Sequence, residues 1–255
     1  MKCCLLSLNG YNLRTNDDDE NGRRMMEKKV KLAFIDNSLD PTIYNPVDHW
    51  SHHVDIQWNT FRAIRNQFPD LKDNYTHLLL SGSEASIVDR KKWVYEETEV
   101  VQEAFKSGLS ILGSCYGHQL LVLALLGPDH VNRSNRPEVG WIPIQIEKES
   151  ELLGKPREAF TFSVHFDEVI NLSDEFTVLA SSKDCEVQAF QMKGRPVWGI
   201  QIHPEINVSN AQELLKNLIA LNLKTKPLFE KALESKPRDS NLILKIVKTF
   251  LASGR

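Results

Sequence analysis

Short apolar runs alternate with helical segments through the first half of the chain, and this alternation limits the possible folds more than any other feature. Runs typical of buried strands occupy residues 30–36, 77–82 and 109–114. Between the last two runs, Asp89 can cap a helix that ends near Lys106, because apolar residues recur there at near-helical spacing. A strand, a helix and a strand in this order predict an α/β protein with a mainly parallel sheet.

The second half of the chain has a different pattern. Beyond Gly140, β-branched and aromatic residues gather in short runs between turn-forming residues, which predicts further strands and hairpins: WIPIQIE, FTFSVH, FTVLASS, CEVQAFQM and PVWGIQIH. From Ser209, a possible helix cap, apolar spacing predicts helices over residues 211–223 and 242–251. The chain has no internal repeat and no clear linker. We therefore expect one domain over residues 29–255, including the C-terminal helices.

Residues 1–28 differ from the rest, because the run from Thr15 to Arg24 is polar, charged and without periodicity. Such a run suggests an N-terminal extension and makes it a candidate for disorder. Over the full 255 residues, 31 Lys and Arg against 34 Asp and Glu give a net charge of −3. A chain without excess positive charge offers little attraction to nucleic acid or to an anionic membrane, so neither is an expected partner.

Cysteine usage favours reduced thiols in the cytoplasm. No CxxC pair or zinc-like spacing occurs among the four cysteines, which are Cys3, Cys4, Cys115 and Cys185. The apolar run at the start is too short for a signal peptide.

No Walker A loop or GxGxxG motif is present, so no nucleotide cofactor is expected, and no metal either. The histidines of HWSHH lack a partner at ligand spacing and suggest an entrance or surface loop: His49, His52 and His53.

The stretch GSCYG carries the strongest chemical signal. Gly113, Cys115 and Gly117 form a G-x-C-x-G pattern between a predicted strand and a predicted helix, which is a nucleophile-elbow arrangement with Cys in place of Ser. A sulfur at the positive end of a helix is favoured as the reactive thiolate. The N–H of Tyr116 and the loop that contains Gly82 could then donate to a developing oxyanion.

A nucleophilic cysteine needs a base, and that base needs an acceptor that fixes its tautomer. His203 and Glu205 follow another apolar run in WGIQIHPE and can fill these two roles. The alternative for Cys115 is a structural buried cysteine, which is the commoner fate of a Cys in apolar surroundings. The flanking glycines and the His-Pro-Glu segment together favour catalysis.

With GSCYGHQ followed by GIQIHPE, the chain resembles the class I glutamine amidotransferase family over roughly residues 31–205. Within it, the chain looks most like the stand-alone, GMP-synthase-like branch that includes plant γ-glutamyl peptidases. The resemblance implies a flavodoxin-like, three-layer α/β sandwich with a mainly parallel central sheet. It also implies hydrolysis of the γ-glutamyl amide of glutamine through a thioester on Cys115, with His203 and Glu205 completing a Cys-His-Glu triad.

The same resemblance assigns the substrate-binding residues. They would supply backbone donors to the oxyanion or hold the amino-acid end of the substrate: Gly82, Ser83, Tyr116, Gln119, Val164 and His165. Ser83 departs from the family pattern, in which many relatives have a second glycine at this position. Asp167 is expected to order its loop rather than take part in chemistry.

Three functions remain open at this point. The ammonia from glutamine could pass to a separate synthetase, because this chain is too short to contain the usual ATP-using domain as well. Alternatively, the enzyme could act alone on γ-glutamyl peptides or conjugates. A non-catalytic binding protein is the third possibility, and the intact triad argues against it.

Overall fold

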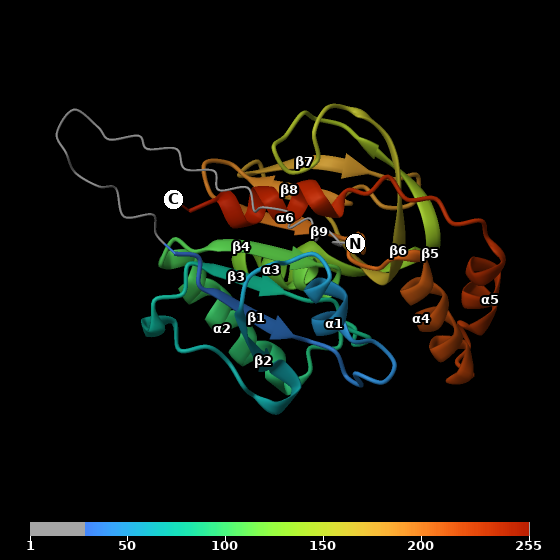
Figure 1. The fold of residues 1–255 in the computed structure, drawn as a ribbon, viewed down its shortest axis with the longest axis horizontal. Coiled ribbons are helices and arrows are strands. Elements are labelled where there is room, and N and C mark those ends of the chain that lie inside the picture. The colour runs from blue at the N-terminus through green and yellow to red at the C-terminus, as the bar shows by residue number, and fades with distance from the viewer. Residues whose placement is uncertain (1–28, 255) are drawn as a thin grey trace, which may run out of the picture.

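A sheet with helices on both faces forms the centre of the computed structural model, which describes residues 29–254 (Figure 1). The expected extension at residues 1–28 lies outside the described residues. The strand order is β2-β1-β3-β4-β9-β8-β7-β5-β6, in one nine-stranded sheet. The predicted α/β sandwich is therefore confirmed, with an antiparallel part added to the parallel one.

One half of the sheet is parallel. Its strands pair in parallel from β2 through to β9, and their bounds are Trp58–Arg62 (β2), Leu32–Asp36 (β1), His77–Leu80 (β3), Ser110–Ser114 (β4) and Val197–Ile200 (β9). Every residue of the four inner strands is buried. Strands covered on both faces read as continuous apolar runs, which is why the sequence pattern located β1, β3 and β4 correctly.

The other half is antiparallel. It contains the remaining strands, which are Val131–Ile146 (β5), Arg157–Val169 (β6), Phe176–Ser181 (β7) and Ala189–Met192 (β8). The hairpin of β5 and β6 extends far beyond the runs that predicted it and projects toward α4 and α5 (Figure 1). The carbonyl of Val164 on β6 lies 3.6 Å from Sγ of Cys115, so the hairpin reaches the carboxyl end of β4, where ligands bind in open α/β sheets.

Helices cover the two faces of the sheet separately. The helices are Pro46–Ser51 (α1), Lys92–Lys106 (α2), Tyr116–Leu126 (α3), Val208–Ala220 (α4), Lys226–Glu234 (α5) and Ile243–Ala252 (α6). Apolar residues of α2 and α3 share a core with one face of the parallel strands, and those of α1 and α6 with the other. A third cluster joins α4 and α5 to Tyr44, Phe162 and Ile206.

Two predicted helix caps are wrong. Helix α2 begins after Lys91, and the Asp89 carboxylate pairs with Arg133 at 3.1 Å instead of capping the helix. Helix α4 is capped by Asn207, whose side chain accepts the N–H of Asn210, because the helix begins before Ser209. Strand β2 was missed because its side chains are polar or partly exposed and show no apolar run.

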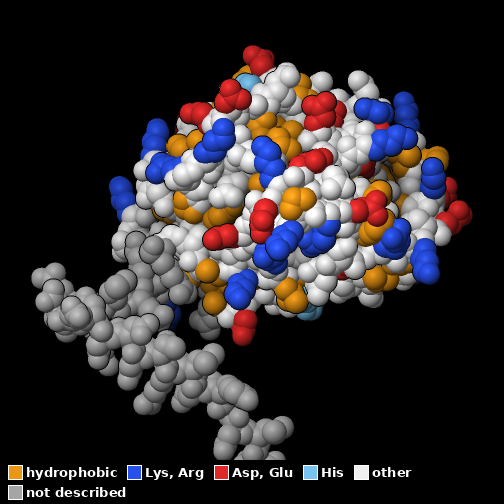
Figure 2. Space-filling model, turned by 90° about the horizontal axis from the view of Figure 1, so that it is seen from above, with side chains coloured by type: hydrophobic (Ala, Val, Ile, Leu, Met, Phe, Trp, Pro, Cys, Tyr) orange, Lys and Arg blue, Asp and Glu red, His pale blue; other side chains and the backbone are white. Residues whose placement is uncertain are grey.

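Within residues 29–254, no helix is long and apolar enough to cross a membrane. On the face shown in Figure 2, acidic and basic side chains are interspersed with scattered apolar ones. This mixed surface agrees with the near-balanced net charge of −3.

Candidate active site

The turn between β4 and α3 has a strained backbone at Cys115. This residue has φ 49° and ψ −104°, a conformation that is unfavourable for a side chain with a Cβ. Its N–H donates to the carbonyl of Ile200 on the neighbouring strand at 2.7 Å, and its carbonyl accepts the N–H of Gln119 at 3.1 Å. These bonds hold the strained residue in place and present its sulfur above the edge of the sheet.

The glycines on either side of Cys115 are required by close backbone approach. A Cβ on Gly113 would collide with the carbonyl of Gly117, and a Cβ on Gly117 would collide with the carbonyl of Leu80. The elbow that the G-x-C-x-G pattern predicted is therefore present in this structure. Tyr116 is the first residue of α3, so its N–H is one of the free donors at the helix N-terminus.

His203 and Glu205 lie together beyond the end of β9. The Nδ1 atom of His203 is 2.8 Å from Oε1 of Glu205, and both side chains are at least 95% buried. The N–H of His203 donates to the carbonyl of Phe162 at 2.9 Å, which ties the residue to β6. Because Nδ1 faces Glu205, Nε2 is the ring nitrogen left to interact with the sulfur of Cys115, which raises the pKa of His203.

The pKa of His203 reflects two opposing causes. Burial lowers it, but the Glu205 carboxylate and the Cys115 sulfur together raise the pKa of His203 to about 10. The ring therefore carries its second proton at neutral pH. An imidazolium beside a sulfur favours the thiolate, which is the nucleophilic form of cysteine.

Two residues that the motifs did not identify support this pair. The ring of Tyr44 packs edge-on against the His203 ring at 5.8 Å, and its hydroxyl approaches Glu205 Oε1 at 3.5 Å. His53 places Nε2 3.2 Å from the carbonyl oxygen of Glu205. The HWSHH segment thus forms the end of α1 and the residues that follow it. The prediction of a surface or entrance loop is only partly correct, because His49 lies on the helix and is buried beside Tyr44.

Gln201 also contacts the sulfur and was missed by sequence reasoning. Its Nε2 lies 3.5 Å from Cys115 Sγ, and its Oε1 accepts a hydrogen bond from Gln119 at 3.0 Å. The side-chain amide of Gln119 donates in addition to the carbonyl of Asp167 at 2.8 Å. The only available signal was the position of Gln201 two residues before His203.

The loop after β3 approaches the same site. A Cβ on Gly82 would lie 2.8 Å from Cε1 of His203 and 2.8 Å from the hydroxyl of Tyr44, so only glycine fits here. The next residue, Ser83, lines the pocket, and its Oγ accepts the N–H of Ala85 at 3.0 Å. The loop that the sequence selected therefore lies against His203 and lines the same cavity as Cys115.

Asp167 connects this loop to β6. One carboxylate oxygen accepts the N–H of Ile87 at 2.9 Å and also the hydroxyl of Ser86. The other lies 3.1 Å from Nε of Arg133. These contacts agree with the expectation that Asp167 orders a loop.

Cys115 and His203 face a cavity of about 280 Å³. Val164 and His165 of β6 line it, and the carbonyl of Val164 lies 3.6 Å from Cys115 Sγ. The structure thus brings together all nine residues that the sequence selected. Seven of them line the cavity, and the other two, Glu205 and Gly82, lie against His203. A cavity of this size fits a small amino-acid derivative.

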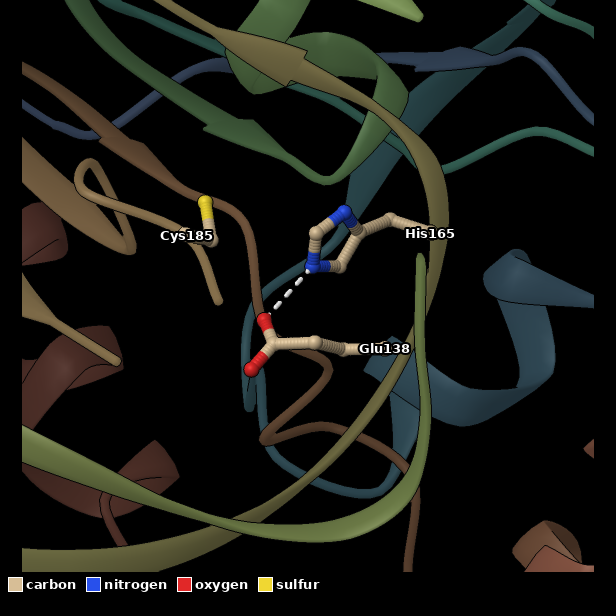
Figure 3. A group of neighbouring side chains, drawn as sticks. All are labelled: Glu138, His165 and Cys185. Atoms are coloured by element: carbon tan, nitrogen blue, oxygen red, sulfur yellow. Dashed lines mark hydrogen bonds and ion pairs between the residues drawn. The ribbon is translucent and has the colours of Figure 1, made fainter. Parts of the chain in front are cut away.

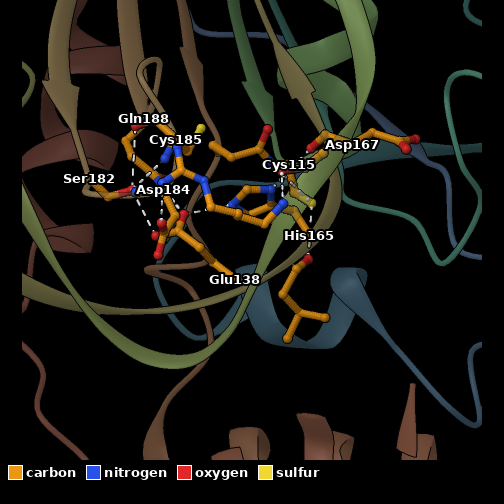
Figure 4. Close-up of polar contacts among 12 residues, drawn as sticks. Cys115, Glu138, His165, Asp167, Ser182, Asp184, Cys185 and Gln188 are labelled. Atoms are coloured by element: carbon orange, nitrogen blue, oxygen red, sulfur yellow. Dashed lines mark hydrogen bonds and ion pairs between the residues drawn. The ribbon is translucent and has the colours of Figure 1, made fainter. Parts of the chain in front are cut away.

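A second group of Cys, His and Glu side chains lies close by (Figure 3). Nε2 of His165 is 2.9 Å from Oε2 of Glu138, and its Nδ1 is 3.1 Å from the carbonyl of Asp167. The carboxylate of Glu138 also accepts hydrogen bonds from Ser182 and Gln188 (Figure 4). The dashed line in Figure 3 joins His165 and Glu138, whereas Cys185 lies to one side.

Cys185 has different surroundings from Cys115. Burial raises the pKa of Cys185 to about 12, and the residue does not line the cavity. It follows no strand-to-helix elbow and lies between β7 and β8. Contacts join Glu138 to His165, Ser182 and Gln188 in a buried polar network beside β6, the strand that carries Val164.

The same three side chains are the one group of potential metal ligands in the described part of the chain. Their ligand atoms lie within 4.8 Å of one another. Both oxygens of Glu138 already have partners in His165, Ser182 and Gln188, and burial raises the pKa of the Cys185 thiol to about 12. The donor set thus fits a hydrogen-bonded network better than a metal.

Known proteins are similar to this chain over most of its length. The chain is 31% identical to γ-glutamyl peptidase 3 of Arabidopsis thaliana over 76% of this chain and 82% of the relative. It is 29% identical to a glutamine-hydrolyzing GMP synthase subunit of Thermoplasma volcanium over 75% of this chain and 92% of the relative. Other GMP synthases match over shorter stretches, and the chain spans less than two thirds of their length.

A crystal structure of a glutamine amidotransferase from Thermotoga maritima has the same fold. The two structures align with a TM-score of 0.63 and 18% identity, over 87% of this chain and 96% of the other. The family described as "Glutamine amidotransferase class-I" matches residues 33–221, which include the elbow, the loop after β3 and the His203–Glu205 pair. The chain belongs to the class I glutamine amidotransferase family.

Proposed function

We propose that this chain hydrolyses the γ-glutamyl amide bond of glutamine through a thioester on Cys115, and that the ammonia passes to a separate acceptor enzyme. The observation that carries the proposal is the strained Cys115 at the N-terminus of α3, beside a protonated His203 in a cavity. This combination supplies a nucleophile, a proton donor and a space for substrate.

In the proposed reaction, the Cys115 thiolate attacks the amide carbon at the end of the glutamine side chain. The C–N bond breaks as His203 protonates the departing nitrogen, which leaves as ammonia. Water then attacks the thioester, gives a proton to His203, and releases glutamate and the thiolate. Glu205 holds the His203 ring and stabilises its charge through the 2.8 Å contact.

The negative oxygen that forms during attack needs donors. We assign this role to the N–H of Tyr116 and to a backbone N–H of the loop at Gly82 and Ser83. Support comes from the free N-terminus of α3 and from the close approach of Gly82 to His203. Gln119 and the backbone of Val164 and His165 would hold the glutamyl part, since all three line the cavity.

The acceptor of ammonia is proposed from the names of the relatives. Several are glutamine-hydrolyzing GMP synthase subunits by name, so a separate synthetase is the partner that we propose for the glutaminase function. The two cysteines of the described chain are free, and we place the reaction in the cytoplasm, where thiols stay reduced.

A γ-glutamyl peptidase is the second candidate, favoured by the relative of that name, of which the chain covers 82%. Both candidates share the thioester chemistry and differ in the leaving group. A protein that only binds and does not catalyse is a third possibility, and the strained elbow speaks against it because such strain costs stability.

The test is product release by the purified chain from L-glutamine and from a γ-glutamyl dipeptide, with Cys115→Ser as the control. We expect glutamate from wild type and a loss of at least about 10³-fold in the variant. Equal activity of Cys115→Ser and wild type would contradict the proposed nucleophile. No glutamate from either compound would favour the non-catalytic binding protein.

A further inference from the structure

The cavity at Cys115 has two chemically different ends. One end is polar, and there the lining residues Ser86 and Arg133 both contact the carboxylate of Asp167 on β6. The other end is apolar and comes from α4, α5 and their connection; we call it the leucine wall, and it consists of Leu214, Leu218, Leu221, Leu223 and Phe229. Such a division orients a substrate that has one zwitterionic and one apolar part.

The leucine wall lies on the side of His203. Tyr44 packs against the His203 ring at 5.8 Å and belongs to the same apolar cluster as Leu214, Leu218 and Phe229. Helix α4, which carries Leu214 and Leu218, begins five residues after His203. The general acid and the apolar wall are therefore adjacent parts of one surface.

The position of His203 determines which part of the substrate meets the wall. A general acid must reach the nitrogen that leaves, so any group bonded to that nitrogen extends to the His203 side of the cavity. The glutamyl ammonium and carboxylate then occupy the end with Arg133 and Asp167. Ammonia carries no carbon, so glutamine alone would leave the wall without a ligand.

Two members of the wall have apolar surface available for binding. Leu221 is 44% exposed and Leu223 is 51% exposed, whereas Leu214 and Leu218 are buried. Exposed leucines at the mouth of a pocket are typical of a binding site for an apolar group.

We propose that the leucine wall binds the leaving group of the substrate, and that this group is an amine or amino acid with a large apolar side chain, carried as its γ-glutamyl amide. This inference rests on the proposed thioester chemistry, which both candidate functions share, and it specifies the leaving group for the second candidate, a γ-glutamyl peptidase. Sulfur attack breaks the C–N bond, the nitrogen keeps the electron pair and takes the proton of His203, and the apolar amine departs. Water then releases glutamate from Cys115.

The test compares kcat/KM of the wild-type chain for γ-glutamylphenylalanine, γ-glutamylglycine and L-glutamine. We expect kcat/KM for γ-glutamylphenylalanine to exceed that for γ-glutamylglycine by about tenfold or more, because burial of an apolar side chain against the wall stabilises the transition state. The double variant Leu221→Gln/Leu223→Gln should lower the ratio of the two dipeptides by about fivefold or more. Both leucines are exposed enough for glutamine to be tolerated without unfolding.

The matched control is Leu244→Gln, because Leu244 is 61% exposed on α6 and does not line the cavity. It should leave the ratio unchanged. Equal kcat/KM for the two dipeptides, or an unchanged ratio in the double variant, would overturn the inference while the thioester chemistry stands. If wild type hydrolyses none of the three compounds, the proposed function fails and the leaving-group assignment fails with it.

Discussion

Nδ1 of His203 lies 2.8 Å from Oε1 of Glu205, and this contact leaves Nε2 to face Cys115. The relationship sets both the orientation and the charge of the imidazole. Burial alone would lower the pKa of His203, so the raised value of about 10 depends on Glu205 and on the sulfur. The nucleophile and its acid therefore form one electrostatic unit with the carboxylate.

Glu205→Gln should lower the pKa of His203, because the main group that opposes the effect of burial is then neutral. We expect kcat/KM for the γ-glutamyl substrate to fall by roughly 10²- to 10⁴-fold. Alkylation of Cys115 by iodoacetamide at pH 7 should also slow, since less imidazolium remains to favour the thiolate. Asp48→Asn, which removes an exposed carboxylate on α1, is the control. An unchanged alkylation rate in Glu205→Gln would contradict the assigned role.

Glu97 on α2 should make stability depend on pH. It is fully buried, and burial raises its pKa to about 8, against a smaller opposing effect of the Asn37 side chain. The folded state holds this proton up to a higher pH than the unfolded state. The contribution of Glu97 to stability therefore falls as the pH rises from 4.5, the ordinary pKa of glutamate, to about 8.

Urea unfolding of wild type and Glu97→Gln at pH 5.5, 6.5 and 7.5 measures this effect. Glutamine is neutral at every pH. The unfolding free energy of the variant should therefore rise relative to that of wild type by up to about 1.4 kcal/mol for each unit by which the pH increases. A difference in unfolding free energy that does not change with pH would show that Glu97 ionises normally in the folded protein.

Gly117→Ala should destabilise the fold and abolish the elbow geometry. The added Cβ would meet the carbonyl of Leu80 on the buried strand β3, and neither backbone can move freely. We expect a loss of about 1–3 kcal/mol in unfolding free energy. Gly194→Asn is the control, since no atom lies within 4 Å of a Cβ there and asparagine tolerates the positive φ of 69°. Equal stability of the two variants would refute the steric explanation.

Asp167→Asn should loosen the loop that approaches the oxyanion. The variant weakens the acceptor for the Ile87 N–H and the pairing with Arg133. A small displacement of catalytic groups is costly, so we expect kcat to fall by about 10- to 100-fold. The matched control is Asp89→Asn, because Asp89 is exposed and pairs with the same residue, Arg133. Similar kcat values for both variants would mean that the loop does not depend on Asp167.

The elbow and its partners could be predicted because their residue types follow directly from local requirements. Gly113 and Gly117 lie where another part of the backbone comes too close for a Cβ, and the His-Pro-Glu segment lies next to a buried apolar run. By contrast, Tyr44 and Gln201 reach the site through tertiary contacts that no local pattern encodes. Residues of this kind are visible only when the strands are placed side by side.

The leucine wall shows a second limit of pattern reading. The spacing of Leu214, Leu218 and Leu221 predicts one buried helix face. In the structure, α4 ends at Ala220, and Leu221 lies partly exposed at the cavity mouth. Apolar periodicity identifies the face of a helix, but it does not distinguish a core from a pocket wall.

The most direct test of the central claim is to identify the cysteine that carries the γ-glutamyl group during turnover. The full chain would be mixed with γ-glutamylphenylalanine, quenched in acid within one turnover, digested and sequenced by mass spectrometry. We predict a γ-glutamyl adduct on Cys115, which disappears in Cys115→Ser and persists in Cys185→Ser. An adduct on Cys185, or turnover with no adduct on Cys115 in any quench, would contradict the assignment.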